Sequence, residues 1–100
     1  MTYFHMKSIL VEAIQFTGSN LMDVVTFIDG KSPNLSYARA LDAWEEYTDI
    51  VSRDGLVIRD KNGRVKHIAS PGDWIIKGVN GEFHTCMPDT FAATYEPALS

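Results

Sequence analysis

A chain of 100 residues, 45% of them hydrophobic and 22% charged, has the size and composition of one folded domain, so residues 1–100 are expected to form a single unit. The formal net charge of −4 excludes a surface that is basic throughout, as most nucleic-acid modules have, and leaves room only for a local basic patch. Because there is one cysteine, no secretion signal and no apolar run near the roughly 20 residues of a membrane span, we expect a cytoplasmic protein without a disulfide or a membrane partner.

The N-terminal third predicts a strand followed by a helix. Residues 9–17 alternate roughly between polar and apolar side chains and end at Gly18, as a strand would. Residues 20–29 carry a clear helix signal, with Ser19 or Asn20 as the N-cap and Gly30 as the stop. The apolar residues of this helix lie three, four and seven positions apart and form one stripe that faces a core: Leu21, Val24, Val25 and Ile28.

The middle of the chain predicts a second helix. After a breaker cluster at residues 32–34, apolar residues recur at helical offsets, namely Tyr37, Ala40, Leu41, Trp44 and Tyr47. Asp42, Glu45 and Glu46 fall on the complementary side. We interpret this acidic face as solvated surface, with a docking surface for a basic partner as the alternative.

From residue 55 onward the pattern changes to strands. Apolar runs flank Asn62-Gly63 and again Asn80-Gly81. Asn-Gly between two apolar runs is the strongest short-range signal of a hairpin with a two-residue turn, because both residues tolerate positive φ. Two such hairpins in succession predict a four-stranded antiparallel meander.

The turn at Asn80-Gly81 also predicts a register for the second hairpin. A two-residue loop places Gly78 opposite Phe83, so that the phenyl ring covers the bare glycine backbone. The side-chain period of two then divides the hairpin into a core face and a mixed, half-wet face. The core face carries Trp74, Ile76, Phe83 and Met87, and the mixed face carries Ile75, Lys77, Val79, Glu82, His84 and Cys86.

Turn signals organise the rest of the C-terminal part. Pro71-Gly72 fits the two central positions of a type II turn, and Asp73 caps that turn through the backbone. Pro88-Asp89 opens a short helix, since proline suits the first helical position and an acid favours the helix N-terminus. Phe91 and Tyr95, four residues apart, share its buried side, and a frayed tail is expected at residues 98–100.

The two ends of the chain resemble a known family. Residues 71–96 read PGDWIIKGVNGEFHTCMPDTFAATYE, which resembles PGDWIIKGVKGEFYPCKPDIFEATYE, the usual form in short proteins of tailed bacteriophages and prophages. Residues 11–18, VEAIQFTG, resemble the N-terminal part of the same family. The resemblance covers roughly a third of the chain and implies a small accessory gene product. It supplies no catalytic residues to transfer.

Most of the matching positions have a structural explanation in the turns and strands described above. They are Gly72, Asp73, Trp74, Gly78, Gly81, Phe83, Cys86, Pro88, Asp89, Phe91 and Tyr95. Asn80, where the usual form has lysine, belongs to the same structural set as part of the hairpin turn. The other departures from the usual form include His84, Thr85, Met87 and Thr90, in place of tyrosine, proline, lysine and isoleucine. No family role is therefore carried over to His84 or Met87.

His84 and Cys86 are the residues with the most reactive side chains in this region. They lie two apart on a strand, hence about 6–7 Å apart along one face, whereas a Cys–His nucleophile pair needs contact within about 3 Å. A metal site would have to recruit His67 or Asp89 as further ligands. We therefore interpret Cys86 as a half-buried apolar side chain, His84 as a surface imidazole and Asp73 as a turn cap, and predict no catalytic residue, metal or cofactor.

The first hairpin is the best candidate for binding. It holds four of the nine Lys and Arg residues within eight positions, followed by a histidine. The candidate binding residues are Arg59, Lys61, Arg64, Lys66 and His67. A basic hairpin tip can bind phosphates or an acidic protein surface. Its alternative role is that of edge-strand charges that prevent aggregation.

These observations predict an α+β fold, in which a small antiparallel sheet of two Asn-Gly hairpins and an N-terminal strand carries one or two helices on one face. The expected function is that of a phage or prophage accessory protein that binds a host protein stoichiometrically in the bacterial cytoplasm, for example to inhibit a defence, replication or transcription component. The alternatives are nucleic-acid or nucleotide binding through the 59–67 hairpin, a virion component and a minor enzyme. A homodimer is an open alternative to a monomer.

Overall fold

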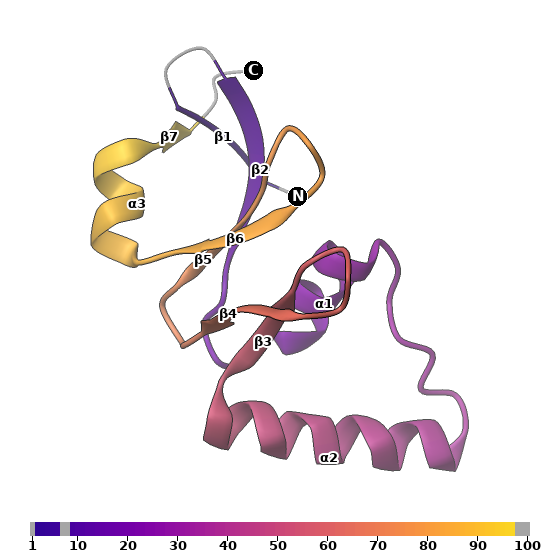
Figure 1. Ribbon diagram of the computed structural model, residues 1–100. Helices are drawn as coiled ribbons and strands as arrows, with labels where there is room; N and C mark the ends of the chain where they lie inside the picture. The colour runs from indigo at the N-terminus through magenta and orange to yellow at the C-terminus, as the bar shows by residue number, and fades with distance from the viewer. Residues whose placement is uncertain (1, 7–8, 98–100) are drawn as a thin grey trace.

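The computed structural model describes residues 2–6 and 9–97 and has the predicted α+β fold. Its main sheet consists of antiparallel strands in the spatial order β6-β5-β2-β1-β7 (Figure 1). Their bounds are β1 (Thr2–Met6), β2 (Ile9–Gln15), β5 (Trp74–Lys77), β6 (Phe83–Cys86) and β7 (Glu96–Pro97). The strand predicted at residues 9–17 is confirmed as β2, whereas β1 and β7 were not predicted.

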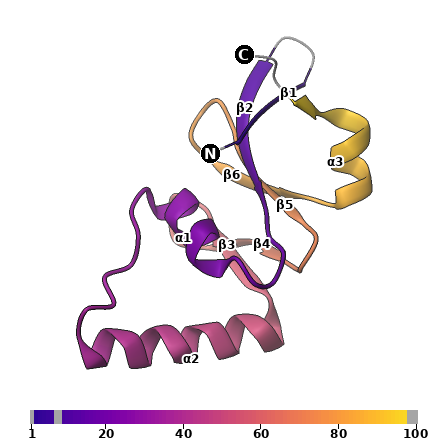
Figure 2. The same ribbon diagram turned by 180° about the vertical axis from the view of Figure 1, so that it is seen from behind.

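A separate two-stranded sheet and three helices complete the described chain. The small sheet is a hairpin of β3 (Leu56–Arg59) and β4 (Val65–Ala69), and the helices are α1 (Leu21–Asp29), α2 (Ala38–Asp54) and α3 (Pro88–Thr94). Figure 2 shows, from behind, that α2 and α3 lie at opposite ends of the molecule. All three predicted helices are confirmed, and α2 extends seven residues past the last apolar position used to predict it.

Local chemistry explains where α1 begins and ends. The Asn20 side chain precedes the helix but does not cap it: Oδ1 accepts the Thr17 N–H at 2.9 Å and Nδ2 donates to the Gln15 carbonyl at 2.8 Å. These bonds fix the helix start to the end of β2. At the other end Gly30, with φ of 81°, donates its N–H to the Thr26 carbonyl at 2.8 Å, as a left-handed C-cap does.

The main sheet is covered on both faces: α1 and α2 pack on one face as expected, and a second layer, which was not predicted, covers the other. Helix α1 and the β3–β4 hairpin cover one face, and the buried residues there are Phe16, Leu21, Val24, Phe27, Val51, Leu56, Ile58, Ala69 and Ile75. Helix α3 covers the other face, where the buried residues are Val11, Ala13, Ile76 and Phe91. The second layer exists because Phe91 stacks on the Trp74 ring, with centroids 4.0 Å apart and planes within 5°.

The prediction of a four-stranded meander is wrong, because β4 and β5 do not pair. The turn between them is present as expected: Asp73 N–H donates to the Ser70 carbonyl at 3.0 Å, and Gly72 has φ of 100°. However, Gly72 N–H donates to the Phe16 carbonyl at 2.6 Å, and Phe16 N–H donates to the Asp73 carbonyl at 2.8 Å. These bonds tie the turn to the end of β2, so β5 pairs with β2 instead.

The predicted register of the second hairpin is wrong by one residue. Phe83 lies opposite Lys77 rather than Gly78. The Gly78 N–H donates across a three-residue loop to the carbonyl just before β6 at 2.8 Å, and Gly81, with φ of 84°, donates back to the Gly78 carbonyl at 2.9 Å. Since side chains alternate along a strand, this slip puts Trp74 and Phe83 on opposite faces of the sheet.

The two faces therefore differ from the predicted ones. Trp74 and Cys86 pack beside the buried residues on the α3 face, whereas Phe83 packs on the α1 face, with its ring centroid 5.6 Å from that of Phe27. Met87, expected in the core, is exposed. The first hairpin has a three-residue loop as well, at residues 61–63, and a bulge between Ile58 and Arg59.

Among the helices of the described residues, none has the length and apolar character needed to cross a membrane. The frayed tail expected at residues 98–100 lies outside the residues that the structure describes.

Candidate binding surface

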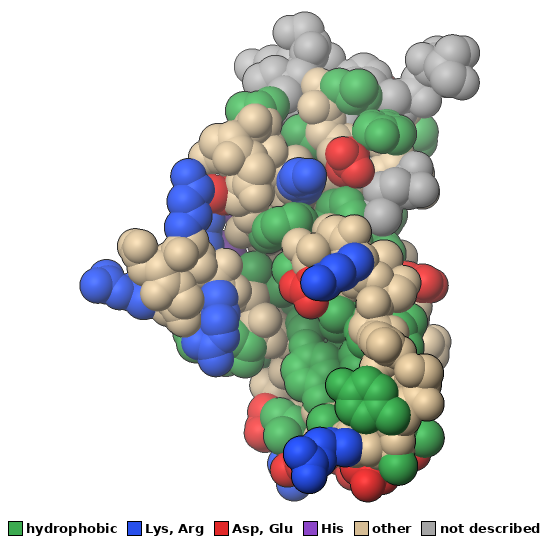
Figure 3. Space-filling view, turned by 90° about the vertical axis from the view of Figure 1, so that its right-hand side faces the viewer, with side chains coloured by type: hydrophobic (Ala, Val, Ile, Leu, Met, Phe, Trp, Pro, Cys, Tyr) green, Lys and Arg blue, Asp and Glu red, His purple; other side chains and the backbone are tan. Residues whose placement is uncertain are grey.

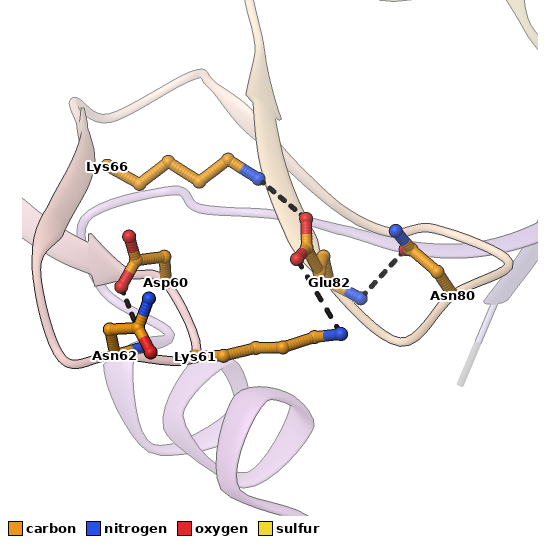
Figure 4. A network of polar contacts seen from close by, with 6 residues as sticks. All are labelled: Asp60, Lys61, Asn62, Lys66, Asn80 and Glu82. Atoms are coloured by element: carbon orange, nitrogen blue, oxygen red, sulfur yellow. Dashed lines mark hydrogen bonds and ion pairs between the residues drawn. The ribbon is translucent and has the colours of Figure 1, made fainter.

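The basic residues of the 59–67 hairpin are partly engaged within the molecule. Arg59 Nη1 donates to the Gly63 carbonyl at 2.8 Å and so closes its own turn. Lys66 Nζ lies 3.3 Å and Lys61 Nζ 3.8 Å from the two carboxylate oxygens of Glu82 (Figure 4). One carboxylate from the second hairpin thus offsets part of the charge of both lysines.

The remaining two residues of this set lie in different surroundings. Arg64 is exposed, and its backbone N–H donates to Asp60 Oδ1 at 3.0 Å. The His67 ring lies edge to face against His84, with centroids 6.4 Å apart. Of the five basic candidates, Arg64 alone has a side chain with no ion pair, hydrogen bond or ring contact to another described residue. Two of the five basic residues, Lys61 and Lys66, therefore pair with Glu82 of the second hairpin, and the first hairpin does not present all five to solvent.

Cys86 and Asp73 have environments that suit a structural role. Burial, and then the Asp73 carboxylate, raise the pKa of the Cys86 thiol. The thiol therefore stays protonated at neutral pH, which is its unreactive form. Asp73 Oδ2 accepts the Ser70 N–H at 2.9 Å, in agreement with the predicted turn cap.

His84 is held in its neutral form. Burial lowers the pKa of the imidazole, and Lys66 and then His67 lower it further, while Glu82 acts in the opposite direction. Two histidines and a lysine therefore meet where β4 touches β6. Within the described part of the chain, no group of three or more His, Cys, Asp or Glu side chains is arranged to hold a metal ion.

The aromatic residues of the C-terminal motif form one stack across the α3 face. Trp74 lies on Phe91, and the Phe91 ring in turn lies 4.9 Å from Tyr95 between centroids. A Cβ at Gly78 would be in tight contact, 3.2 Å from Asn80 Oδ1 and 3.4 Å from the Glu82 carbonyl oxygen. These motif residues therefore have a structural role on the α3 face. The opposite end of the molecule is formed by α2 (Figure 2).

The inner side of α2 is a surface that the sequence did not predict as a site. Of the 17 residues of α2 only Val51, near the C-terminal end, is buried, at 7% exposure. Trp44 and Tyr47 are half-buried neighbours with ring centroids 5.7 Å apart. Figure 1 shows α2 below the rest of the chain, and Figure 3 shows hydrophobic side chains gathered in the lower half of one side of the molecule.

A hollow of about 200 Å³ lies between α1, α2 and β3. We call it the interhelical hollow, and its lining consists of Val25, Ile28 and Asp29 from α1, Tyr47 from α2 and all of β3 (Leu56–Arg59). Burial, and then Asp29, raise the pKa of the Tyr47 hydroxyl. The phenol therefore keeps its proton and offers one hydrogen-bond donor in a mainly apolar wall.

The sequence did contain a signal for this surface. Ala40, Trp44, Tyr47 and Val51 are spaced four, three and four apart, which places them on one side of a helix. Such a stripe normally packs against a core, and it was expected to lie on the sheet. In the structure Val51 is buried in the core, Trp44 and Tyr47 pack half-buried against the same core, and Tyr47 also lines the hollow.

No family model, curated protein or solved structure matches this chain in the three comparisons made. The surfaces described above are therefore the basis for a functional assignment.

Proposed function

We propose that this chain is a small phage or prophage accessory protein that binds a bacterial host protein one to one and catalyses no reaction. The observation that carries the proposal is the interhelical hollow, bordered by a helix of 17 residues with one buried side chain. The resemblance of residues 11–18 and 71–96 to phage proteins supports the origin. The protonated Cys86 thiol favours a structural role for the most nucleophilic side chain of the motif.

The hollow and the aromatic pair at its α2 wall, of which Tyr47 lines the hollow, have the chemistry of a protein-binding site. Tryptophan and tyrosine supply a large contact area at low entropic cost and dominate binding energy in many interfaces. Here Trp44 and Tyr47 are half-buried side by side on one helix. Covering an apolar side chain completely contributes about 1.5–3 kcal/mol relative to leaving it exposed. Because Trp44 and Tyr47 are already half-buried and Val57 is 38% exposed, a partner that covers these three side chains gains a part of each contribution.

The surroundings of the hollow favour a basic partner. The outward side of α2 carries Asp42, Glu45, Glu46 and Asp49, and Asp29 lines the hollow itself. A partner with lysine or arginine next to its apolar contact residues is attracted to this end of the molecule and oriented on it. A docking surface for a basic partner is the alternative interpretation that the sequence left open for the acidic face of this helix.

The experiment is quantitative affinity capture from a bacterial lysate, followed by titration calorimetry with the captured protein after purification. The tested change is Val57→Asp, which places a carboxylate in the hollow, and the matched control is Val79→Asp, at a valine that is 81% exposed in the second hairpin turn. We expect one protein to be captured by the wild type and by Val79→Asp and to be lost with Val57→Asp.

Thermal melts establish that both variants are folded, and Tyr47→Ala provides a second change to the hollow without adding a charge. Calorimetry is expected to give one partner per chain. Capture that is equal for all variants would place the binding surface elsewhere. Turnover of a small molecule by the purified chain, with no protein captured, would refute the proposal.

A further inference from the structure

The interhelical hollow follows the open edge of a β-strand. All four residues of β3 line it, although successive side chains of a strand point to opposite faces. A cavity over one face would meet only every second residue, so a cavity that meets all of them runs along the edge. Strand β3 has β4 as its sole neighbour in the small sheet, and its other edge makes no backbone hydrogen bond to another segment of the described chain.

The walls of the hollow limit what can occupy that edge. Helix α1 supplies Val25 and Ile28 on one side, and α2 supplies Tyr47 on the other. A volume of about 200 Å³ is too narrow for an α-helix, whose diameter with side chains is about 10–12 Å. A second folded sheet would bring its own covering layers against both helices. A single extended chain needs only about 4.8 Å of lateral spacing from β3, so it is the narrowest polypeptide element that can occupy this edge.

The charges define the chemistry of that chain. Asp29 lies in the wall and α2 carries further carboxylates on its outward side, while Arg59, which also lines the hollow, donates to the Gly63 carbonyl. The apolar lining selects apolar side chains at the centre of the segment, and the acidic surroundings select lysine or arginine at its ends. Burial keeps the Tyr47 hydroxyl protonated, so it can donate to a main-chain carbonyl of the segment.

We propose that an extended, apolar segment of the partner, flanked by basic residues, adds to the free edge of β3 as a third strand of the small sheet. This inference rests on the proposed function, because it specifies how the partner engages the interhelical hollow. Main-chain hydrogen bonds to β3 supply affinity, and alternate side chains enter the hollow and supply specificity.

The test uses a displayed library of random twelve-residue peptides, panned against the full chain and counter-selected against the Tyr47→Ala variant. Enriched peptides are then synthesised without the display scaffold. We expect alternating apolar residues with lysine or arginine at the ends and no central proline. Amide hydrogen exchange should slow at least tenfold in the complex at alternate residues of 56–59, because only those N–H groups face the free edge and gain partners.

An N-methyl scan of the synthetic peptide separates strand addition from other modes of binding. Methylation at every second position should weaken binding tenfold or more, and methylation at the intervening positions should change it less than threefold, since only alternate N–H groups of an added strand face β3. Sensitivity with a period other than two, unchanged exchange of the β3 amides, or no peptide that depends on Tyr47 would overturn the inference. If lysate capture still depends on Val57 in that case, the proposed function stands and only the strand-addition mode is wrong.

Discussion

Replacement of Gly55 by alanine tests the junction that sets α2 against β3. Gly55 has φ of 90° and ψ of 171°, a region that is essentially restricted to glycine. A Cβ there would stand 2.7 Å from Ile68 Cγ2 and 3.1 Å from the Ala69 carbonyl oxygen. Backbone strain of this kind costs about 1–3 kcal/mol. Displacing the packed neighbours adds about 1 kcal/mol or more.

The expected loss of unfolding free energy for Gly55→Ala is therefore about 2–4 kcal/mol, measured by urea denaturation. For a domain of this size each kcal/mol lowers Tm by about 4–8 °C, so a thermal melt should fall by more than 8 °C. The matched control is Gly30→Ala, because Gly30 also has positive φ but its Cβ would meet no atom within 4 Å. The control should cost only about 1–2 kcal/mol.

The Ile68→Ala variant separates the two contributions. Ile68 is 56% exposed, so its truncation alone should cost little. In the Gly55→Ala background the same truncation removes the 2.7 Å contact and should recover part of the loss, while the backbone strain remains. If Gly55→Ala is no more destabilising than Gly30→Ala, the junction does not constrain α2 as described, and the shape of the interhelical hollow has another cause.

Three further measurements test the surroundings of the hairpins. Glu82→Gln should lower the unfolding free energy by no more than about 1 kcal/mol in urea titrations, and 1 M salt should abolish the difference, because the ion pairs are partly exposed. Because the folded state lowers the pKa of His84, the unfolded chain binds more protons in acid. The contribution of His84 to stability should therefore be fully present above about pH 6.5 and fall below it. The urea midpoint of His84→Gln should fall less steeply with decreasing pH than that of the wild type. Charge reversal of Arg64 together with Lys66 should leave host-protein capture unchanged, whereas a nucleic-acid-binding role would show a salt-dependent affinity that this change abolishes.

The parts of the fold that local chemistry determines could be predicted from the sequence. The α1 boundaries follow from Asn20 and Gly30, which flank a stripe of apolar residues, and both are confirmed. The short α3 helix follows from Pro88 at its first position and from Phe91 and Tyr95, which stack as expected. In each case the residues that decide the structure lie within one or two turns of each other.

Strand pairing depends on residues far apart in the sequence, and there the predictions failed. An Asn-Gly pair signals a reversal, but it does not distinguish a two-residue loop from the three-residue loop found at Gly81. The separation of β4 from β5 depends on two hydrogen bonds between Phe16 and the Gly72 turn, more than 50 residues away in sequence. Strand β1 pairs over five residues with β2, but no pattern in residues 2–6 predicted this strand.

For the candidate site, too, the local patterns could be predicted from the sequence, whereas the contacts between distant segments could not. The basic residues of the first hairpin were visible in the sequence, yet their partial engagement depends on Glu82 from the second hairpin. The apolar stripe of α2 was visible too, but a stripe that packs completely and one that borders a hollow have the same spacing. The tertiary arrangement of α1, α2 and β3 leaves Val51 buried in the core and Tyr47 half-buried against it, at the wall of the hollow.

The proposed binding at the interhelical hollow would couple to the stability of α2. In proteins most of the stability of a helix comes from tertiary packing of its apolar face. In α2 the one buried residue, Val51, lies in the last turns, and the turns around Trp44 have no fully buried side chain. A segment added beside β3 would contact Tyr47 and add to the partial packing of Trp44 and Tyr47 against the core. Binding at the hollow should therefore slow amide exchange along α2 as well as along β3, with the largest change in the turns that precede Val51.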